Sequence, residues 1–142
     1  MTLDELYANI DKDFSIDETD IGNESLRSAN LFQKYIRLYT DSKLQLELLL
    51  NKRKNLICEK REYYAGNAAP EVYKEKPFDL RIKTEAVMEK YLDSDIDIVK
   101  YDEKIVLQQE KVNALRACLE TIKNRNFQIK NYIDYQKFIN GL

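Results

Sequence analysis

The sequence predicts an all-α protein. Its 142 residues include only three Gly and two Pro, so the chain lacks the turn residues that an all-β fold needs between short strands. Apolar residues recur instead at three- and four-residue spacing over long stretches, which is typical of amphipathic helices. A chain of this length suffices for one domain with one core. We therefore expect a single cooperative unit built from helices.

Helical patterns account for most of the N-terminal half. Apolar spacing predicts a short helix over residues 2–11 and a long helix over about 20–64. Gly66 follows the long helix, and a glycine at this place can adopt the left-handed conformation that ends many helices. Both prolines lie within residues 67–78, which are therefore expected to form a loop.

Two further helices are predicted in the C-terminal half. A short helix is expected over residues 79–92, and Ser94 and Asp97 then have the spacing of a capping box that opens a helix over about 95–140. Such a helix would be about 70 Å long. A compact domain of this size has a radius of gyration of only roughly 14 Å. The apolar side of the last helix must therefore face another long helix or another chain.

The last helix carries apolar residues at the seven-residue spacing of coiled coils. We expect the two long helices to form a hairpin, and we expect such protomers to assemble through coiled-coil-type packing into a homo-oligomer. Packing of the two helices within one chain is the alternative explanation of the same spacing. Eight residues are assigned to the oligomer contact: Ile98, Ile105, Val112, Leu115, Leu119, Ile122, Ile129 and Ile133.

Charged residues are separated into blocks, although the net charge is only −2. Residues 1–24 contain eight acids and one base, whereas residues 25–61 contain nine bases and three acids. The alternation repeats, with twelve acids against seven bases in 62–110 and six bases against two acids in 111–142. Such blocks often form solvated helix faces or salt links. The basic blocks also suit an anionic partner such as a nucleic acid.

The inventory of reactive residues argues against an enzyme. The chain has no His and its three glycines are isolated, which excludes a Ser-His-Asp triad, the usual His-containing zinc sites and a glycine-rich phosphate loop. Cys58 and Cys118 have no neighbouring cysteine and are predicted to be unpaired thiols. We expect no catalysis, no cofactor and no metal. Because neither a signal peptide nor a membrane-spanning run is visible, a cytoplasmic protein without a membrane partner is expected.

The segment 51–66 holds the main candidate site. On a helix, Arg53, Lys60 and Arg61 share one face, and Tyr64 lies one turn beyond. Clustered basic residues can neutralise phosphates and exposed aromatic rings can stack on nucleobases, which favours single-stranded DNA as the ligand. The alternative is that the basic residues are solvated and the tyrosines belong to the core. The predicted nucleic-acid-binding residues are Lys52, Arg53, Lys54, Lys60, Arg61, Tyr63 and Tyr64, with Lys123, Arg125 and Lys130 as a weaker second set.

Four segments of the chain are distinctive. They are Lys12-Asp13 with Ile16-Asp17 and Thr19; the basic run into Tyr63-Tyr64-Ala65-Gly66; Asp95-x-Asp97-Ile98-Val99-Lys100-x-Asp102; and Ile122-Lys123-x-Arg125-x-Phe127-x-Ile129-Lys130. None is a general-purpose motif, but in this order they resemble the UvsY family of phage recombination mediators. The resemblance extends over the whole length of the chain without large gaps.

The resemblance implies a ring-like, non-catalytic homo-oligomer that binds single-stranded DNA. It also implies contacts with a phage RecA-like recombinase and a phage single-strand-binding protein, in the cytoplasm of an infected bacterial host. In this family the helix entering the tyrosine pair binds DNA, and the C-terminal helix mediates oligomerisation. One position departs from the family, which has two basic residues separated by one residue before the tyrosines. Lys60 matches the second, but Cys58 occupies the first, and Arg61 moves the charge by about 100° around the helix.

These predictions divide the chain into three parts: a DNA-binding part with an acidic arm (1–66), a loop (67–78) and an oligomerisation region (79–142). The predicted function is to promote loading of the recombinase onto DNA covered by the single-strand-binding protein, in phage recombination, repair and replication. The alternative is a structural or regulatory coiled-coil protein that binds only other proteins.

Overall fold

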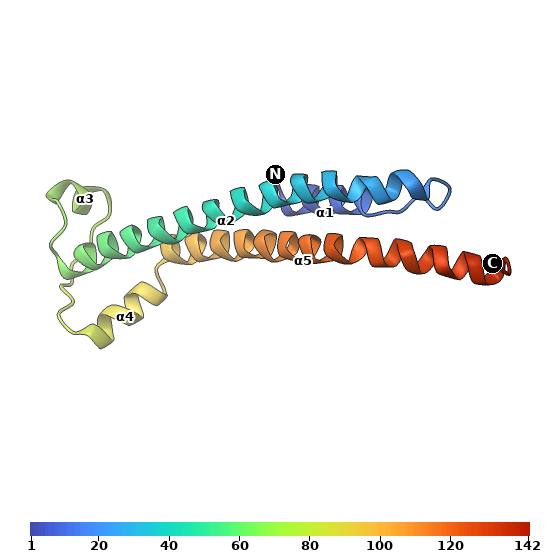
Figure 1. Cartoon of the computed structure of the whole chain (residues 1–142). Helices are drawn as coiled ribbons and strands as arrows, with labels where there is room; N and C mark the ends of the chain where they lie inside the picture. Colours follow the sequence, from blue (N-terminus) through green and yellow to red (C-terminus); the bar gives the residue numbers. More distant parts are fainter. The chain divides into compact units, whose positions relative to one another are not determined.

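The computed structural model describes residues 1–142 and contains five α-helices and no strand (Figure 1). The helices are α1 (Leu3–Asp13), α2 (Ile21–Ala65), α3 (Pro70–Glu75), α4 (Glu85–Asp93) and α5 (Ile96–Ile139). The all-α prediction is therefore confirmed, and α2 and α5 are the two long helices that the sequence indicated. No helix combines the length and the apolar character that crossing a membrane requires.

Local hydrogen bonds explain where the first helices start and end. Thr2 caps α1, because its hydroxyl accepts the backbone N–H of Glu5 while the Glu5 carboxylate accepts the backbone N–H of Thr2. α2 ends before the predicted glycine, Gly66, which has a φ of 82°. The backbone N–H groups of Gly66 and Asn67 donate back to carbonyls in the last turn of α2, which is the Schellman arrangement.

The segment between the long helices differs from the prediction. Residues 67–78 were expected to be a loop, but they contain α3, which starts at Pro70 because proline suits the first turn of a helix. The short helix expected over 79–92 begins only at Glu85. The residues before it are not helical, since the backbone N–H of Ile82 donates at 3.0 Å to a carbonyl at the end of α2 rather than within a helix.

The start of α5 also differs in detail. The predicted capping box places Ser94 before the helix, but Ser94 ends α4, and its hydroxyl donates to the Lys90 carbonyl at 2.9 Å. Asp95 caps α5 instead, because its carboxylate accepts the backbone N–H groups of Asp97 and Ile98 at 2.9 and 3.2 Å. A carboxylate is favoured there, since a helix N-terminus attracts negative charge.

The chain forms two compact units, and each contains residues from both sides of the predicted loop. The first unit consists of Met1–Leu44 and Gln109–Leu142, and the second consists of Gln45–Gln108. Within each unit, a stretch of α2 packs antiparallel against a stretch of α5, as expected for the arms of a hairpin.

The core of the first unit lies between α1, α2 and α5. Its buried members are Leu6, Leu31, Tyr35, Leu115, Cys118 and Ile122. Asp13 at the end of α1 fixes this helix to α2, because its carboxylate accepts hydrogen bonds from Lys34 at 2.5 Å and from the Tyr35 hydroxyl at 2.9 Å. Part of the acidic N-terminal block is thereby paired with the basic block that follows it.

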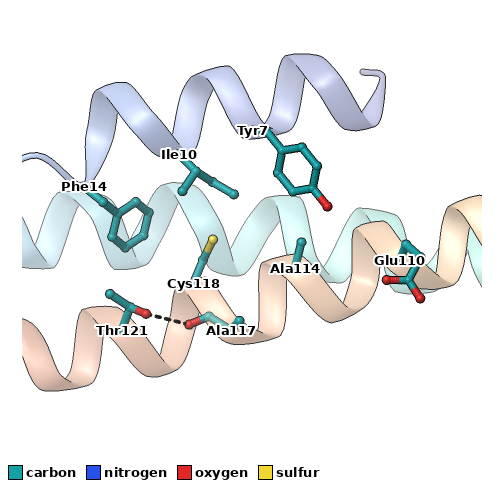
Figure 2. A pocket seen from close by; sticks show the side chains of 8 residues that line it. All are labelled: Tyr7, Ile10, Phe14, Glu110, Ala114, Ala117, Cys118 and Thr121. Carbon is teal, nitrogen blue, oxygen red and sulfur yellow. Dashed lines mark hydrogen bonds between the residues drawn. The ribbon is translucent and has the colours of Figure 1, made fainter.

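A groove of about 450 Å³ opens between α1 and α5 in this unit (Figure 2). Its lining consists of Tyr7, Ile10 and Phe14 from α1 and Glu110, Ala114, Ala117, Cys118 and Thr121 from α5. Small side chains on this face of α5 leave room for the larger side chains of α1. Cys118 is buried beneath them, and burial raises the pKa of its thiol. It therefore behaves as a small core residue, while Cys58 is exposed.

The core of the second unit lies where α4 and the start of α5 meet the last turns of α2. Ile82, Met88, Leu92 and Ile98 are buried there, and Tyr64 packs against them. This core fixes the acidic segment that contains α4 and the start of α5 beside the predicted basic segment.

Candidate nucleic-acid interface

All seven residues of the main predicted site lie in the last four turns of α2, within the second unit. They fall into three groups with different surroundings. Lys52 and Lys54 point into solvent, Arg53 and Arg61 form exposed ion pairs, and Lys60 with the two tyrosines belongs to a partly buried network.

Lys52 and Lys54 are the freely accessible charges of the segment. Both side chains are exposed and neither forms an ion pair within the chain. Their ammonium groups are therefore available to an anionic ligand without the loss of an internal contact.

Arg53 and Arg61 are each paired with a carboxylate from the acidic segment. Arg53 Nε donates to Asp102 Oδ1 of α5 at 2.5 Å, and Arg61 binds Glu85 of α4 through two bonds of 2.8 and 3.0 Å. These hydrogen bonds raise the pKa of both guanidinium groups, and the bond from Arg61 lowers the pKa of Glu85. All four side chains remain at least 36% exposed, so water surrounds both pairs.

Lys60 is held more firmly. Its ammonium lies 2.6 Å from Asp97 and 3.3 Å from Asp95, and its side chain is only 15% exposed. Burial by itself would lower the pKa of Lys60, but the hydrogen bonds and charges of the two aspartates raise it. Lys60 therefore stays charged and joins the end of α2 to the start of α5.

Asp95 is the centre of this network. Besides capping α5, its carboxylate accepts a hydrogen bond of 2.5 Å from the Tyr64 hydroxyl. Burial would raise the pKa of Asp95, but the bonds from Tyr64, Ile98 and Lys60 together with the charge of Lys60 hold it below its usual value. The carboxylate is therefore ionised, paired and structural.

The tyrosine pair belongs to an aromatic cluster. Tyr64 lies against Phe78 and Tyr91, with ring centroids 5.1 and 5.5 Å away. Tyr63 stacks on Tyr73 at 5.3 Å with an angle of 16° between the rings. The Tyr63 hydroxyl donates to a backbone carbonyl after α3, and the Tyr73 hydroxyl donates to the Tyr63 carbonyl at 2.7 Å. The rings thus hold the segment after α2 against this helix. This agrees with the alternative in which the tyrosines belong to the core.

An open pocket of about 600 Å³ lies beside this cluster, between the end of α2, α3 and the start of α5. Lys60, Tyr63, Lys76 and Asp97 contribute to its lining. Lys76 is 68% exposed and lies 3.7 Å from Asp97. Lys76 was not predicted from the sequence because it lies in the expected loop. The carboxylates that pair with the basic residues were not predicted either, because the sequence showed only that acidic and basic blocks alternate.

The weaker second set is divided by the structure. Lys123 and Lys130 are exposed on α5 and form no ion pair. Arg125 is only 2% exposed and forms a buried ion pair with Glu24 of α2, whose backbone carbonyl also accepts at 3.1 Å. Arg125 is therefore not a nucleic-acid contact as predicted, since a buried guanidinium cannot reach a strand. The spacing gives the reason: Arg125 stands on the buried seam of α5, between Ile122 and Ile129.

Most of the eight residues predicted for the oligomer contact are buried or half-buried within a single chain. Ile98, Val112, Leu115, Ile122 and Ile129 are buried within the chain, Ile105 and Leu119 are half-buried, and Ile133 is exposed. In the first unit, Leu115 and Ile122 pack against residues of α1 and α2. From Ile98 to Ile129, the seven-residue spacing therefore supports packing of α5 within the chain.

The last turns of α5 present a different apolar surface. Arg125 of α5 pairs with Glu24 in the first turn of α2. Beyond this pair, α5 continues well past the start of α2 (Figure 1). The apolar side chains of this end are consequently uncovered, with Phe138 81% and Ile139 56% exposed.

Three comparisons place this chain among known proteins. Residues 9–142 match the UvsY family, described as recombination, repair and ssDNA binding protein UvsY. A relative, recombination protein uvsY of Enterobacteria phage T4, is 24% identical over 141 residues, which cover 99% of each chain. Two crystal structures of the bacteriophage T4 recombination mediator protein UvsY share the fold. The structure of lattice type II aligns with a TM-score of 0.81 at 22% sequence identity, and the alignment covers 99% of this chain and 98% of that chain. Lattice type IV has a TM-score of 0.80 at 23% identity and covers 97% and 98%.

The helical fold and the paired charges at the end of α2 define an all-α protein with a charged candidate site. No three His, Cys, Asp or Glu side chains are arranged to hold a metal ion. With the family matched over most of its length, the chain belongs to the UvsY family, as the four distinctive segments indicated.

Proposed function

We propose that this protein is a recombination mediator. It binds single-stranded DNA as a homo-oligomer and promotes loading of a phage RecA-like recombinase onto DNA covered by the phage single-strand-binding protein. The observation that carries this proposal is the match to the UvsY family over residues 9–142. The role depends on holding phosphates and neighbouring chains rather than on bond chemistry, so it requires no catalytic residue and no cofactor.

The second unit supplies the phosphate contacts in this proposal. Lys52 and Lys54 provide accessible charges, and Arg53 and Arg61 stand beside them at the surface of the same helix end. Lys60 and Tyr64 act chiefly by fixing this end of α2 in place. Tyr63 lines the adjacent open pocket. Of the two tyrosines, it is therefore the one that we assign to contact with a nucleobase.

Self-association is assigned to the uncovered end of α5. Exposed apolar side chains gather after Ile129, where no other helix of the first unit covers α5. Burial of this surface against other copies removes apolar area from water and stabilises an assembly. Several copies then present several basic helix ends, so that weak contacts add through effective concentration.

Binding of labelled oligothymidylate at two salt concentrations tests the first part of the proposal. We expect measurable binding at low salt that weakens steeply as salt is added, because each phosphate contact releases counterions. A folded protein that fails to bind at low salt would instead support the alternative function, a coiled-coil protein that binds only other proteins.

The mediator step needs a separate test. Recombinase activity is measured on single-stranded DNA already covered by the single-strand-binding protein, with and without this protein. We expect a shorter lag before recombinase activity on covered DNA and little change on bare DNA. An equal effect on both substrates would show general stimulation rather than mediation.

A further inference from the structure

The ion pairs of Arg53 and Arg61 join two segments of opposite charge. Residues 25–61 carry an excess of bases and residues 62–110 an excess of acids. The second unit brings the end of the first segment against the second, so that Asp102 and Glu85 occupy the two guanidinium groups.

The two pairs have the geometry that a phosphate would also use. Arg53 contacts both oxygens of Asp102, at 2.5 and 3.4 Å, and Arg61 contacts both oxygens of Glu85. A guanidinium group presents a planar fork that fits two oxygens of a carboxylate or of a phosphate equally well. The carboxylates therefore stand where phosphate oxygens would stand in a complex with a nucleic acid strand.

The exposure of these pairs separates them from the neighbouring network. Arg53 and Asp102 are 36% and 46% exposed, and Arg61 and Glu85 are 40% and 63% exposed. Exposed ion pairs contribute little to stability, because water screens both charges. Exchange of the carboxylate for another anion therefore costs little free energy.

Lys60, at the same end of α2, gives the contrast. Its partner Asp95 is 4% exposed, caps α5 and accepts the Tyr64 hydroxyl, so breaking this contact would disturb the core. The ion pairs of Arg53 and Arg61 can therefore exchange their carboxylates for another anion, whereas the ion pair of Lys60 is part of the core.

We propose that Asp102 and Glu85 act as an intramolecular competitor of single-stranded DNA, occupying Arg53 and Arg61 until the phosphates of a strand displace them. This inference rests on the proposed DNA binding of the same helix end. When a strand arrives, Lys52 and Lys54 contact its phosphates first. Arg53 and Arg61 contact phosphates only after their carboxylates are released. The competitor weakens binding of short or isolated strands and favours long strands that engage many helix ends at once.

The test compares two double variants that remove the same amount of negative charge. Asp102→Asn/Glu85→Gln releases both arginines. Glu103→Gln/Asp79→Asn is the control, because Glu103 and Asp79 are exposed residues of the same unit that form no ion pair. Both sets of amides are close in size to the carboxylates that they replace, and circular dichroism checks that the helix content is unchanged.

The first variant should bind oligothymidylate roughly three- to tenfold more tightly than the control at low salt, since two weak pairs no longer compete. On short strands, where the arginines of the wild type stay paired with their carboxylates, its slope of log affinity against log salt should also be steeper by up to about 1.4, because about 0.7 is added for each extra phosphate neutralised. Equal affinities and slopes for the two variants would overturn the inference while leaving DNA binding by the wild type intact.

A third variant shows whether the gain in affinity for oligothymidylate depends on the two arginines. Adding Arg53→Gln and Arg61→Gln to Asp102→Asn/Glu85→Gln should abolish the gain in affinity. A gain that persists without the two arginines would overturn the inference. Loss of binding by every protein, wild type included, would instead contradict the proposed function itself.

Discussion

The Tyr64 hydroxyl, on the last full turn of α2, donates a hydrogen bond of 2.5 Å to the buried carboxylate of Asp95, the residue that caps α5. The two residues are 31 positions apart, and their contact ties the end of one long helix to the start of the other. The sequence suggested that Tyr64 stacks on nucleobases. In the second unit its hydroxyl instead stabilises the contact between α2 and α5.

Replacing Tyr64 by Phe should destabilise the fold while leaving DNA affinity nearly unchanged. The variant keeps the ring but leaves a buried carboxylate without one of its donors, which costs about 1–3 kcal/mol. Urea unfolding measures the loss, and Tyr135→Phe is a control because Tyr135 is 60% exposed. A Tyr64→Phe protein with wild-type stability and weakened DNA binding would assign Tyr64 to the ligand instead.

Stability should fall on acidification. The pKa values of Asp95 and Glu24 are held below their usual range, in each case because hydrogen bonds and nearby cations outweigh burial, which acts in the opposite direction. Depressed carboxyl pKa values contribute stability that is complete above the unfolded-state pKa of about 4 and is lost as the pH falls through the lower folded-state pKa.

Urea unfolding between about pH 6 and about pH 3 measures this dependence. A Glu24→Gln variant should be less stable than the wild type near neutrality, and its stability should change less with pH. Asp79→Asn, at an exposed position without an ion pair, should follow the wild-type curve. Parallel curves for Glu24→Gln and the wild type would contradict the assignment.

Removing the two free lysines should weaken DNA binding. For Lys52→Ala/Lys54→Ala we expect lower affinity for oligothymidylate and a salt slope shallower by about 1.4, which corresponds to two phosphate contacts on a single strand. Lys83→Ala/Lys90→Ala removes the same charge from exposed positions of the same unit and should have a smaller effect. If both variants lose affinity equally, net charge rather than this helix end determines binding.

Changes at the end of α5 should reduce the oligomer without unfolding the protomer. Phe138→Asp/Ile139→Asp places charges on side chains that are 81% and 56% exposed, so helix content should remain while the mass measured by sedimentation falls. Val112→Asp is the informative comparison. Val112 is 1% exposed, and a charge there should unfold the protomer. Wild-type mass for the first variant would place the assembly contact elsewhere.

The helices were largely predictable because their signals are local. Apolar spacing located α1, α2 and α5, and Gly66 marked the end of α2, since the left-handed conformation is available to glycine without strain. The segment between the long helices was harder to predict. The hydrogen bond from Ile82 to the end of α2 and the cap formed by Asp95 depend on residues that meet only in the folded chain.

The sequence by itself determined the helical class, the family and the segregation of charge, because residue type and spacing carry these properties. Only the tertiary structure decided what each charge does. Arg125 and Arg53 are indistinguishable as residues on a helix, yet one is buried against Glu24 and the other lies at the surface beside Asp102. Helical periodicity gives the face on which a side chain stands, but the partner facing it comes from a helix far away in the sequence. Burial and pairing, which determine whether a cation can reach a phosphate, are therefore set by the fold.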